Sequence, residues 1–336
     1  MTVVGPFGLS VRDQALEADV QAGLAAVEEG LLEATKSEVP FITEAAQHLV
    51  KAGGKRFRPL LVMLAAQFGD SHAPGVVPSA VVVELTHLAT LYHDDVMDEA
   101  DVRRGVASAN ANWDNSVAVL TGDFLFARAS HILADLGPEA VRIQAEAFER
   151  LVTGQILETA GPRDGRDPVD HYLDVLAGKT GSLVAVSGRF GAMMSGADER
   201  VVDILTQYGE RLGIAFQLAD DVLDIASDSH ESGKTPGTDL REGIPTLPVL
   251  HLRARAAASG DPADQELCAL LDGDLTDDAR HAEALHRLRA HPALEQARRD
   301  TVRYAEEARA MLGPLPTSPA RAALEELCDA VVHRAG

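Results

Sequence analysis

Residues 79–98, SAVVVELTHLATLYHDDVMD, form a long apolar stretch that ends in three aspartates: Asp94, Asp95 and Asp98. Residues 216–228, FQLADDVLDIASD, end in the same way, with Asp220, Asp221 and Asp224. Both clusters have the form DDxxD, and the apolar pattern before each predicts a helix. Because residues four apart share a helix face, the first and third aspartates of each cluster point the same way.

These acidic clusters are unfavourable unless something compensates them. Like charges four residues apart repel, and carboxylates near a helix C-terminus oppose the macrodipole; each effect costs a few tenths to about 1 kcal/mol. Since the sequence accepts both costs twice, we expect a compensating cation. Magnesium suits such oxygen ligands, because it usually binds one or two carboxylates together with substrate phosphates. For one cluster taken alone, a solvated acidic helix face is the alternative.

Composition indicates a mainly helical protein. The 336 residues are 46% hydrophobic and only 4% aromatic, and sustained alternation of apolar and polar residues is almost absent. No linker separates two regimes of composition, so we expect a single domain over residues 1–336, with an N-terminal helical region at 1–35 and a motif-bearing core at about 50–250. The expected helices cover 13–36, a segment ending at 51, a segment starting at 59, 79–98, 114–136, 138–160, 168–190 and 199–226, and residues 228–245 are expected to form a long loop.

The net charge of −22 argues against nucleic acid and anionic membranes as partners. Two cysteines, Cys268 and Cys328, provide neither a disulfide framework nor a metal-binding spacing, which fits a reducing cytoplasm. The N-terminus lacks the pattern of a secretory signal, and no apolar run approaches the roughly 20 residues of a membrane span. We therefore expect a cytoplasmic protein with no transmembrane segment.

Residues 53–59, GGKRFRP, place positive charge where a helix begins. Such charge is unfavourable at a helix N-terminus unless an anion binds there. Glycine leaves backbone amides accessible, and Lys55 and Arg58 add charge, so a phosphate pocket is one interpretation. A helix stop followed by a basic helix start is the other.

Further polar residues lie close to the aspartates in sequence. Arg103 and Arg104 follow the first cluster and either compensate the helix end or bind a diphosphate with their planar guanidinium groups. His87 lies two turns before Asp94, where a core histidine and a ligand are both possible.

The second cluster has similar neighbours. Lys179 and Thr180, in the sequence GKTG, interrupt an apolar helix and indicate either a kink or a close approach to a polyanion. Gln217 falls on the face of Asp220, where it could bind water. Lys234 lies in the glycine-rich loop, where an exposed surface lysine is the alternative.

The ordered motifs resemble those of the trans-isoprenyl diphosphate synthases, or polyprenyl synthetases, and most resemble the bacterial long-chain members. The resemblance covers roughly residues 53–248 and comprises GGKRFRP, ELTHLATLYHDDVMDEADVRRG, TGDFLFA, GQILE, GKTGSL, FQLADDVLD and GKTPGTDLREGIPTLPVL. It implies an all-α isoprenoid-synthase-type bundle around a deep central cavity, usually assembled as a homodimer. It also implies a prenyltransferase that condenses isopentenyl diphosphate with an allylic diphosphate.

The resemblance also implies roles for individual residues. Magnesium ions, about three per active site, would be bound by Asp94, Asp98 and Asp220, with support from Asp95, Asp221 and Asp224. Isopentenyl diphosphate would contact Lys55, Arg58, His87 and Arg104. The allylic diphosphate would contact Arg103, Lys179, Thr180, Gln217 and Lys234. The catalytic set would be Asp94, Asp98, Lys179, Gln217 and Asp220. The sequence departs from some relatives at Ile244 and Pro245, where they carry a basic residue. Binding of the allylic diphosphate is therefore expected to depend more on Lys234.

Product length should depend on what blocks the cavity below Asp94. The positions one, two and three turns away are occupied by small or branched residues: Thr90 with Ala89, Thr86, and Val83 with Val82. In the family, a bulky ring just before the first motif gives short products, so the small residues here favour geranylgeranyl or a longer chain. The motif ELTHLATLYHDDVMDEA most resembles bacterial long-chain synthases that make quinone side chains, which favours a product beyond geranylgeranyl. Phe124, Phe126 or another helix could still supply a floor.

Three other functions stay open. A geranylgeranyl diphosphate synthase would have the same site above a shallower cavity. A non-catalytic regulatory subunit would act through a partner synthase, although both aspartate motifs are intact. A terpene cyclase would share the first motif but normally carries an Asn/Ser/Glu-type second motif, which fits this sequence least.

Overall fold

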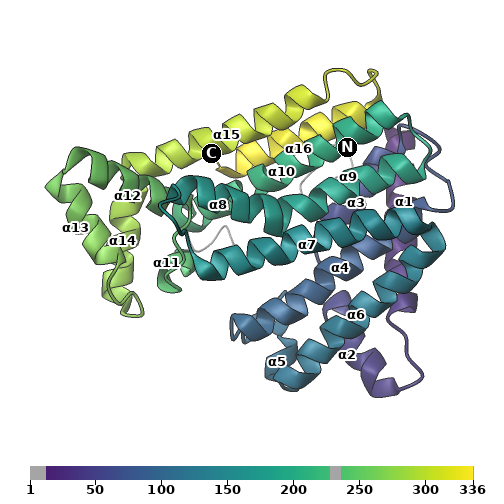
Figure 1. Cartoon of the computed structure of the whole chain (residues 1–336), viewed down its shortest axis with the longest axis horizontal. Coiled ribbons are helices and arrows are strands. Elements are labelled where there is room, and N and C mark those ends of the chain that lie inside the picture. Colours follow the sequence, from purple (N-terminus) through teal and green to yellow (C-terminus); the bar gives the residue numbers. More distant parts are fainter. Residues whose placement is uncertain (1–12, 228–235, 336) are drawn as a thin grey trace. The chain divides into compact units, whose positions relative to one another are not determined.

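The computed structural model describes residues 13–227 and 236–335, and these residues are almost entirely helical (Figure 1). The elements, in chain order, are α1 (Gln14–Ala34), α2 (Pro40–Lys51), α3 (Phe57–Ala66), α4 (Val76–Met97), β1 (Val102–Arg103), β2 (Val106–Ala107), α5 (Ala109–Asn112), α6 (Asn115–Leu136), α7 (Pro138–Ala160), α8 (Pro168–Leu176), the π-helical turn η1 (Ala177–Gly181), α9 (Ser182–Met194), α10 (Glu199–Ala226), α11 (Thr238–Arg241), α12 (Leu247–Ser259), α13 (Pro262–Leu271), α14 (Asp278–Arg289), α15 (Pro292–Met311) and α16 (Pro319–Ala335). The two short strands form an antiparallel pair. The predicted all-α fold class is confirmed, whereas the deep central cavity stays a prediction.

The chain divides into two compact units. Unit 1 takes residues 1–149, 183–209 and 311–327, and unit 2 takes 150–182, 210–310 and 328–336. Each unit gathers three separate stretches of sequence, and α7, α9, α10, α15 and α16 have residues in both. The single domain expected from composition stays a prediction.

The core of unit 1 is built on α4. Leu85, Leu88 and Tyr92 of this helix are fully buried, and the Tyr92 hydroxyl donates to the carbonyl of Ala45 in α2 at 2.6 Å. Helix α6 approaches α4 closely at Gly122, where an added Cβ would lie 2.3 Å from Nε2 of His93. The apolar stretch before the first aspartate cluster is therefore a central core helix, and its C-terminal end carries the motif.

Helix α6 is the one described helix long and apolar enough, by length and composition alone, to cross a membrane. A third of its most apolar window is buried inside the protein. This is weak support for a span, because the core helix of a folded domain has the same length and composition.

The segment expected as one helix over 168–190 is interrupted in the structure. It consists of α8, the turn η1 and α9, and the π-helical turn contains Lys179. The interruption occurs where Gly178 packs against α7: an added Cβ would lie 2.8 Å from the carbonyl oxygen of Arg150. Because this contact joins distant parts of the chain, local periodicity does not reveal it.

The loop expected over 228–245 is wrong for residues 238–241, which form α11. The cause is a contact with the second aspartate motif, because the Asp224 carboxylate accepts from the amide of Thr238 at 3.2 Å. Residues 228–235 lie outside the described part of the chain.

The C-terminal part of unit 2 buries a charged group among its helices. The carboxylate of Asp264 in α13 is 4% exposed, accepts from Arg255 Nε at 2.9 Å and lies 3.0 Å from Nε2 of His291. The hydrogen bond with His291 lowers the pKa of Asp264, and Arg255 acts in the same direction against the effect of burial. Both partners favour the ionised carboxylate.

We predict that Asp264 makes stability depend on pH. Since its pKa is lower in the folded protein, its contribution is present above the ordinary carboxyl pKa of about 4 and is lost as pH falls through the folded value. Asp264→Asn should lower the free energy of unfolding at neutral pH, and its difference from wild type should shrink in acid. Urea denaturation at about pH 7 and about pH 3 measures both quantities.

Asp203→Asn is the matched control, because Asp203 is exposed on α10. It should leave stability unchanged at both pH values. An equal loss for Asp264→Asn at both pH values would contradict the electrostatic origin.

Candidate functional site

The basic residues of the GGKRFRP motif gather on unit 1 around a buried carboxylate. Glu84 of α4 is 1% exposed, and its Oε1 accepts from Arg56 Nη1 at 2.8 Å and lies 3.7 Å from Arg104 Nη2. The charge of Glu84 also acts on Arg58, whose pKa it raises against the effect of burial. We call Arg56, Arg58, His87 and Arg104 the basic cluster.

The backbone between α2 and α3 shapes the basic cluster. Gly54 has φ +155°, and an added Cβ would lie 2.8 Å from the guanidinium carbon of Arg104. Arg104 donates to the carbonyl of Gly53 and, at 3.2 Å, to that of Leu49. Arg56 adopts the left-handed conformation at φ 46°, just before α3 begins. The glycine therefore allows Arg104, which is distant in sequence, to pack directly against this loop.

The charges in the basic cluster do not balance internally. Arg56 pairs with Glu84 and also with Glu28 of α1, to which its Nη2 donates at 3.1 Å. Burial, helped by Arg104, lowers the pKa of Arg58 to about 10 although Glu84 opposes the shift, and Arg58 Nε is buried without a hydrogen-bond partner among the described residues. Arg58 and Arg104 thus share one carboxylate with Arg56, an arrangement that favours an anion.

His87 takes part in the basic cluster as a neutral group. Burial lowers its pKa well below the ordinary value, and the positive charges of Arg58 and Arg104 lower it further. At neutral pH the imidazole can therefore donate one hydrogen bond and accept another without adding charge. The side chain of His87 is half-buried.

The first aspartate motif is held from one side. Asp95 is fully buried, and its Oδ1 accepts from Arg103 Nε at 2.5 Å. Burial raises the pKa of Asp95, and the hydrogen bond from Arg103 opposes this shift. Arg103 Nη2 also lies 3.8 Å from Oδ2 of Asp98, whose side chain is 61% exposed. Arg103 therefore compensates the acidic end of α4, which is one of the two roles that the sequence left open for it.

The second aspartate motif, in unit 2, likewise has a buried middle aspartate that accepts a hydrogen bond from a side chain of another element. Asp221 is buried and accepts from the hydroxyl of Tyr172 in α8. Burial raises the pKa of Asp221 well above its ordinary value, whereas the hydrogen bonds from Tyr172 and Gln217 act to lower it. The carboxylate of Asp224 accepts from the amides of Thr238 and Asp239 at 3.2 and 3.3 Å. Asp220 is half-buried.

Lys179 and Thr180 lie near the second motif within unit 2. Lys179 Nζ donates to Glu158 of α7 at 2.6 Å, and the Thr180 hydroxyl lies 3.5 Å from Oε1 of Gln217. Both residues belong to the π-helical turn η1, which follows α8, the helix that carries Tyr172.

The predicted residues fall into two groups. Unit 1 holds the first motif and the basic cluster, and unit 2 holds the second motif with Lys179, Thr180 and Gln217. Lys55 is exposed beside the basic cluster in sequence, and Lys234 lies outside the described residues. Among the described residues, no three His, Cys, Asp or Glu side chains are grouped closely enough to hold a metal ion. Magnesium commonly completes its coordination with phosphate and water, so the aspartates fit it only together with a diphosphate.

Sequence reasoning missed four residues that contact the site: Arg56, Glu84, Glu158 and Tyr172. Arg56, Glu84 and Glu158 belong to the motifs GGKRFRP, ELTHLATLYHDDVMDEADVRRG and GQILE. The sequence shows that these residues are charged but does not show which residues they contact. Tyr172 had no sequence signal, because its contact with Asp221 spans 49 residues.

The residues below Asp94 are packed rather than open in this structure. Ala89 and Val83 are fully buried, and the buried Thr86 accepts from Gln144 Nε2 of α7 at 2.9 Å. The half-buried Thr90 donates to the carbonyl of His87 at 2.8 Å. Phe126 of α6 and Phe148 of α7 pack with ring centroids 4.5 Å apart and ring planes inclined at 54°.

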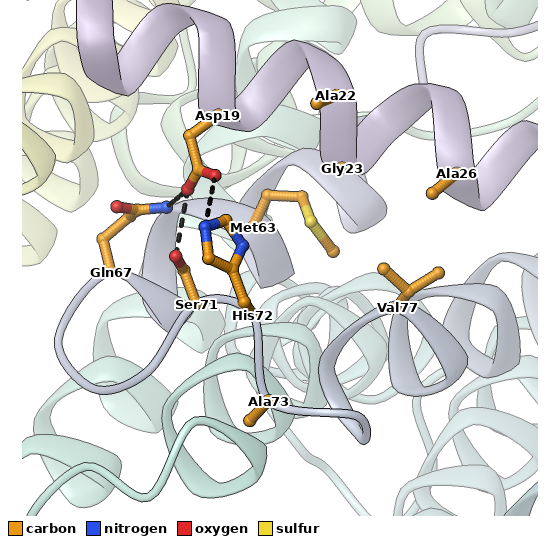
Figure 2. Close-up of a pocket in the computed structure, with 10 residues that line it drawn as sticks. All are labelled: Asp19, Ala22, Gly23, Ala26, Met63, Gln67, Ser71, His72, Ala73 and Val77. Carbon is orange, nitrogen blue, oxygen red and sulfur yellow. Dashed lines mark hydrogen bonds and ion pairs between the residues drawn. The ribbon is translucent and has the colours of Figure 1, made fainter.

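Unit 1 also contains a pocket of about 260 Å³ between α1, α3 and the segment before α4 (Figure 2). Small residues of α1 and Met63 line its apolar part, and Asp19 accepts from Ser71 at 3.0 Å at its polar rim. None of the predicted site residues lines this pocket. Its carboxylate is already engaged by the surrounding side chains.

The polyprenyl synthetase family model matches residues 39–288. The nonaprenyl diphosphate synthase of Mycobacterium tuberculosis is 48% identical over 330 residues, which cover 98% of this chain and 97% of that protein. A geranylgeranyl pyrophosphate synthase from Corynebacterium glutamicum, solved with calcium and isoprenyl diphosphate, superposes with a TM-score of 0.87 at 44% identity and covers 97% of this chain and 99% of its own. A decaprenyl diphosphate synthase from Rhodobacter capsulatus has a TM-score of 0.85 at 37% identity and covers 96% and 99%.

The helical fold and the ordered motifs define a prenyl-transferring enzyme. The chain belongs to the polyprenyl synthetase family, as its motifs predicted.

We predict that Glu84 stabilises the basic cluster. Glu84→Gln keeps the shape but removes the charge that Arg56, Arg58 and Arg104 share, so the free energy of unfolding should fall by about 1–3 kcal/mol. Urea denaturation measures the loss. Glu33→Gln is the control: its pair with Lys36 is 72% and 60% exposed, and its removal should cost roughly 0–1 kcal/mol. Equal losses for the two variants would show that burial of Glu84 carries no special weight.

Proposed function

We propose that this prenyltransferase condenses isopentenyl diphosphate with an allylic diphosphate and extends it to an all-trans chain longer than geranylgeranyl. The observation that carries this proposal is the basic cluster around the buried Glu84, because Glu84 stands on the helix whose end carries the first aspartate motif. An excess of guanidinium groups next to metal-binding carboxylates is suited to a diphosphate.

The six aspartates would divide the work. Asp94, Asp98 and Asp220 would bind magnesium. Asp95, Asp221 and Asp224 would orient these three magnesium-binding aspartates. The carboxylates of the orienting aspartates already accept hydrogen bonds from Arg103, from Tyr172 and from the amides of α11, respectively. When bound, the metal would neutralise charge on the departing diphosphate. The calcium in the Corynebacterium glutamicum enzyme supports a divalent cation in this family.

The remaining residues would bind and orient the substrates. Lys55, Arg58, Arg104 and neutral His87 would hold isopentenyl diphosphate, and Arg103, Lys179, Thr180, Gln217 and Lys234 would hold the allylic diphosphate. The allylic C–O bond breaks, and its electron pair leaves with the diphosphate. The isopentenyl double bond then attacks the allylic cation, and the released diphosphate takes the proton that is lost. Positioning and electrostatic stabilisation would supply the catalysis.

Chain length separates the two leading versions of this function. The relatives from Mycobacterium tuberculosis and Rhodobacter capsulatus make nonaprenyl and decaprenyl diphosphate, and that from Corynebacterium glutamicum makes geranylgeranyl diphosphate. The small side chains of Ala89, Thr90, Thr86 and Val83 support the longer product. A cytoplasmic homodimer is part of the proposal and stays a prediction.

We predict that the enzyme needs both aspartate motifs. Asp94→Ala and Asp220→Ala should each reduce magnesium-dependent turnover about a thousandfold or more, since stabilisation of the leaving diphosphate is lost. Consumption of isopentenyl and farnesyl diphosphate measures the rate. Asp203→Ala, an exposed position on α10, is the control and should keep full activity. Near-normal turnover by either motif variant would refute the metal assignment, and an inactive wild type would favour the regulatory-subunit alternative.

We predict that product length depends on the helix below Asp94. Wild type should extend farnesyl diphosphate well beyond geranylgeranyl, and Ala89→Phe should shorten the product, because a ring would project from a fully buried position. Mass spectrometry of the products measures chain length. Crowding at this position should also cost about 1–3 kcal/mol of stability, so thermal unfolding is followed in parallel.

Ala145→Phe adds the same ring at an exposed position of α7 and should leave the products unchanged. An unchanged distribution for Ala89→Phe would place the floor on another element. A wild-type product that stops at geranylgeranyl would select the shorter-chain alternative.

A further inference from the structure

Helix α14 of unit 2 contacts the end of α10 and the turn that precedes α11, and both contacts lie just C-terminal to the second aspartate motif. Arg289 Nε donates to the carbonyl of Ile225 at 2.7 Å, and Nη2 donates to the carbonyl of Ser227. Eight residues earlier on α14, Nε2 of His281 donates to the carbonyl of Gly237 at 2.8 Å. Figure 1 shows α11 beside α14. The two side chains are eight residues apart, so they project from one side of α14.

Arg289 meets the end of α10 where negative charge accumulates. The last carbonyls of a helix have no partner within it, and the macrodipole is negative there. The second motif adds three carboxylates within the final two turns of the same helix. A half-buried guanidinium that binds two of these carbonyls satisfies them and brings a positive charge to the motif.

His281 acts on the motif through Gly237. Gly237 has φ +71°, and an added Cβ would lie 2.7 Å from Nε2 of His281. The amide of Gly237 donates to the carbonyl of Asp224 at 2.8 Å, and the next two amides donate to the Asp224 carboxylate. The buried His281 therefore fixes the turn that orients Asp224.

We propose that α14 is the support of the second aspartate motif, with Arg289 and His281 as positioning residues. The catalytic consequence rests on the proposed function, in which this motif binds the metal. Neither residue belongs to a recognised motif of this chain, and both lie beyond the motif-bearing core at about 50–250. Carboxylates that bind a metal depend on the groups that hydrogen-bond and orient them, so loss of the support should weaken metal binding.

Helix α14 supplies its own control. Arg287 lies two residues before Arg289, but its Nη2 donates to the carbonyl of Ala263 at 3.3 Å and lies 4.0 Å from Glu266. Among the described residues, both of these contacts are with α13. Arg287→Ala removes the same side chain from the same helix without touching the motif.

The experiment compares wild type with Arg289→Ala, Arg289→Lys, His281→Gln and Arg287→Ala. The magnesium concentration that gives half-maximal turnover should rise about tenfold for Arg289→Ala, less for Arg289→Lys, and remain unchanged for Arg287→Ala. Maximal turnover at saturating magnesium should fall much less. Hydrogen exchange should accelerate at residues 222–227 and 237–242 in Arg289→Ala and His281→Gln only.

The outcomes separate this inference from the proposed function. Equal magnesium dependence and equal exchange for Arg289→Ala and Arg287→Ala would overturn the support role. If Arg289→Ala fails to fold, Arg289→Lys and His281→Gln decide by the same two measurements. A wild type without prenyl transfer would refute the proposed function, while hydrogen exchange would still show whether α14 holds the end of α10.

Discussion

Negative charge at the C-terminal end of a helix is the constraint on which the rest of the site depends. Both α4 and α10 end in three aspartates, where the backbone dipole is already unfavourable. In each motif the middle aspartate is buried and bonded to a side chain from another element, Arg103 in one case and Tyr172 in the other. The fold thus buries the middle carboxylate of each motif, whereas Asp94 and Asp220 are half-buried and Asp98 is exposed.

In the basic cluster of unit 1, by contrast, positive charge exceeds the negative charge that compensates it. Arg56 and Arg104 lie against the buried carboxylate of Glu84 in the core helix α4, and the same carboxylate acts electrostatically on the pKa of Arg58. Because burial makes unbalanced charge expensive, the cluster favours an anionic partner. Glu84 and the first aspartate motif stand on one helix, so α4 contributes to both the cationic and the anionic parts of unit 1.

Sequence periodicity predicted some elements closely and failed at others for identifiable reasons. The expected helices at 138–160 and 199–226 coincide with α7 and α10, because both have continuous apolar spacing without internal proline. The helix expected over 168–190 contains a π-helical turn, which forms where Gly178 meets α7. Helix α11 was missed because Asp224, far along the preceding helix, supplies its N-terminal hydrogen bonds. The same limit applied to the site residues: the sequence showed which motif residues are charged, but it did not show which residues they contact.

The sequence by itself determined the all-α class, the family and the set of polar residues available for chemistry, since these depend on local periodicity and on the order of short motifs. Only the tertiary structure decided which of those residues are buried and what they contact. Asp95 and Asp94 are neighbours of the same type, yet one is fully buried on Arg103 and the other is half-buried. The physical reason is that burial and hydrogen bonding depend on packing between distant elements, such as Tyr172 on Asp221 and Arg289 on Ile225.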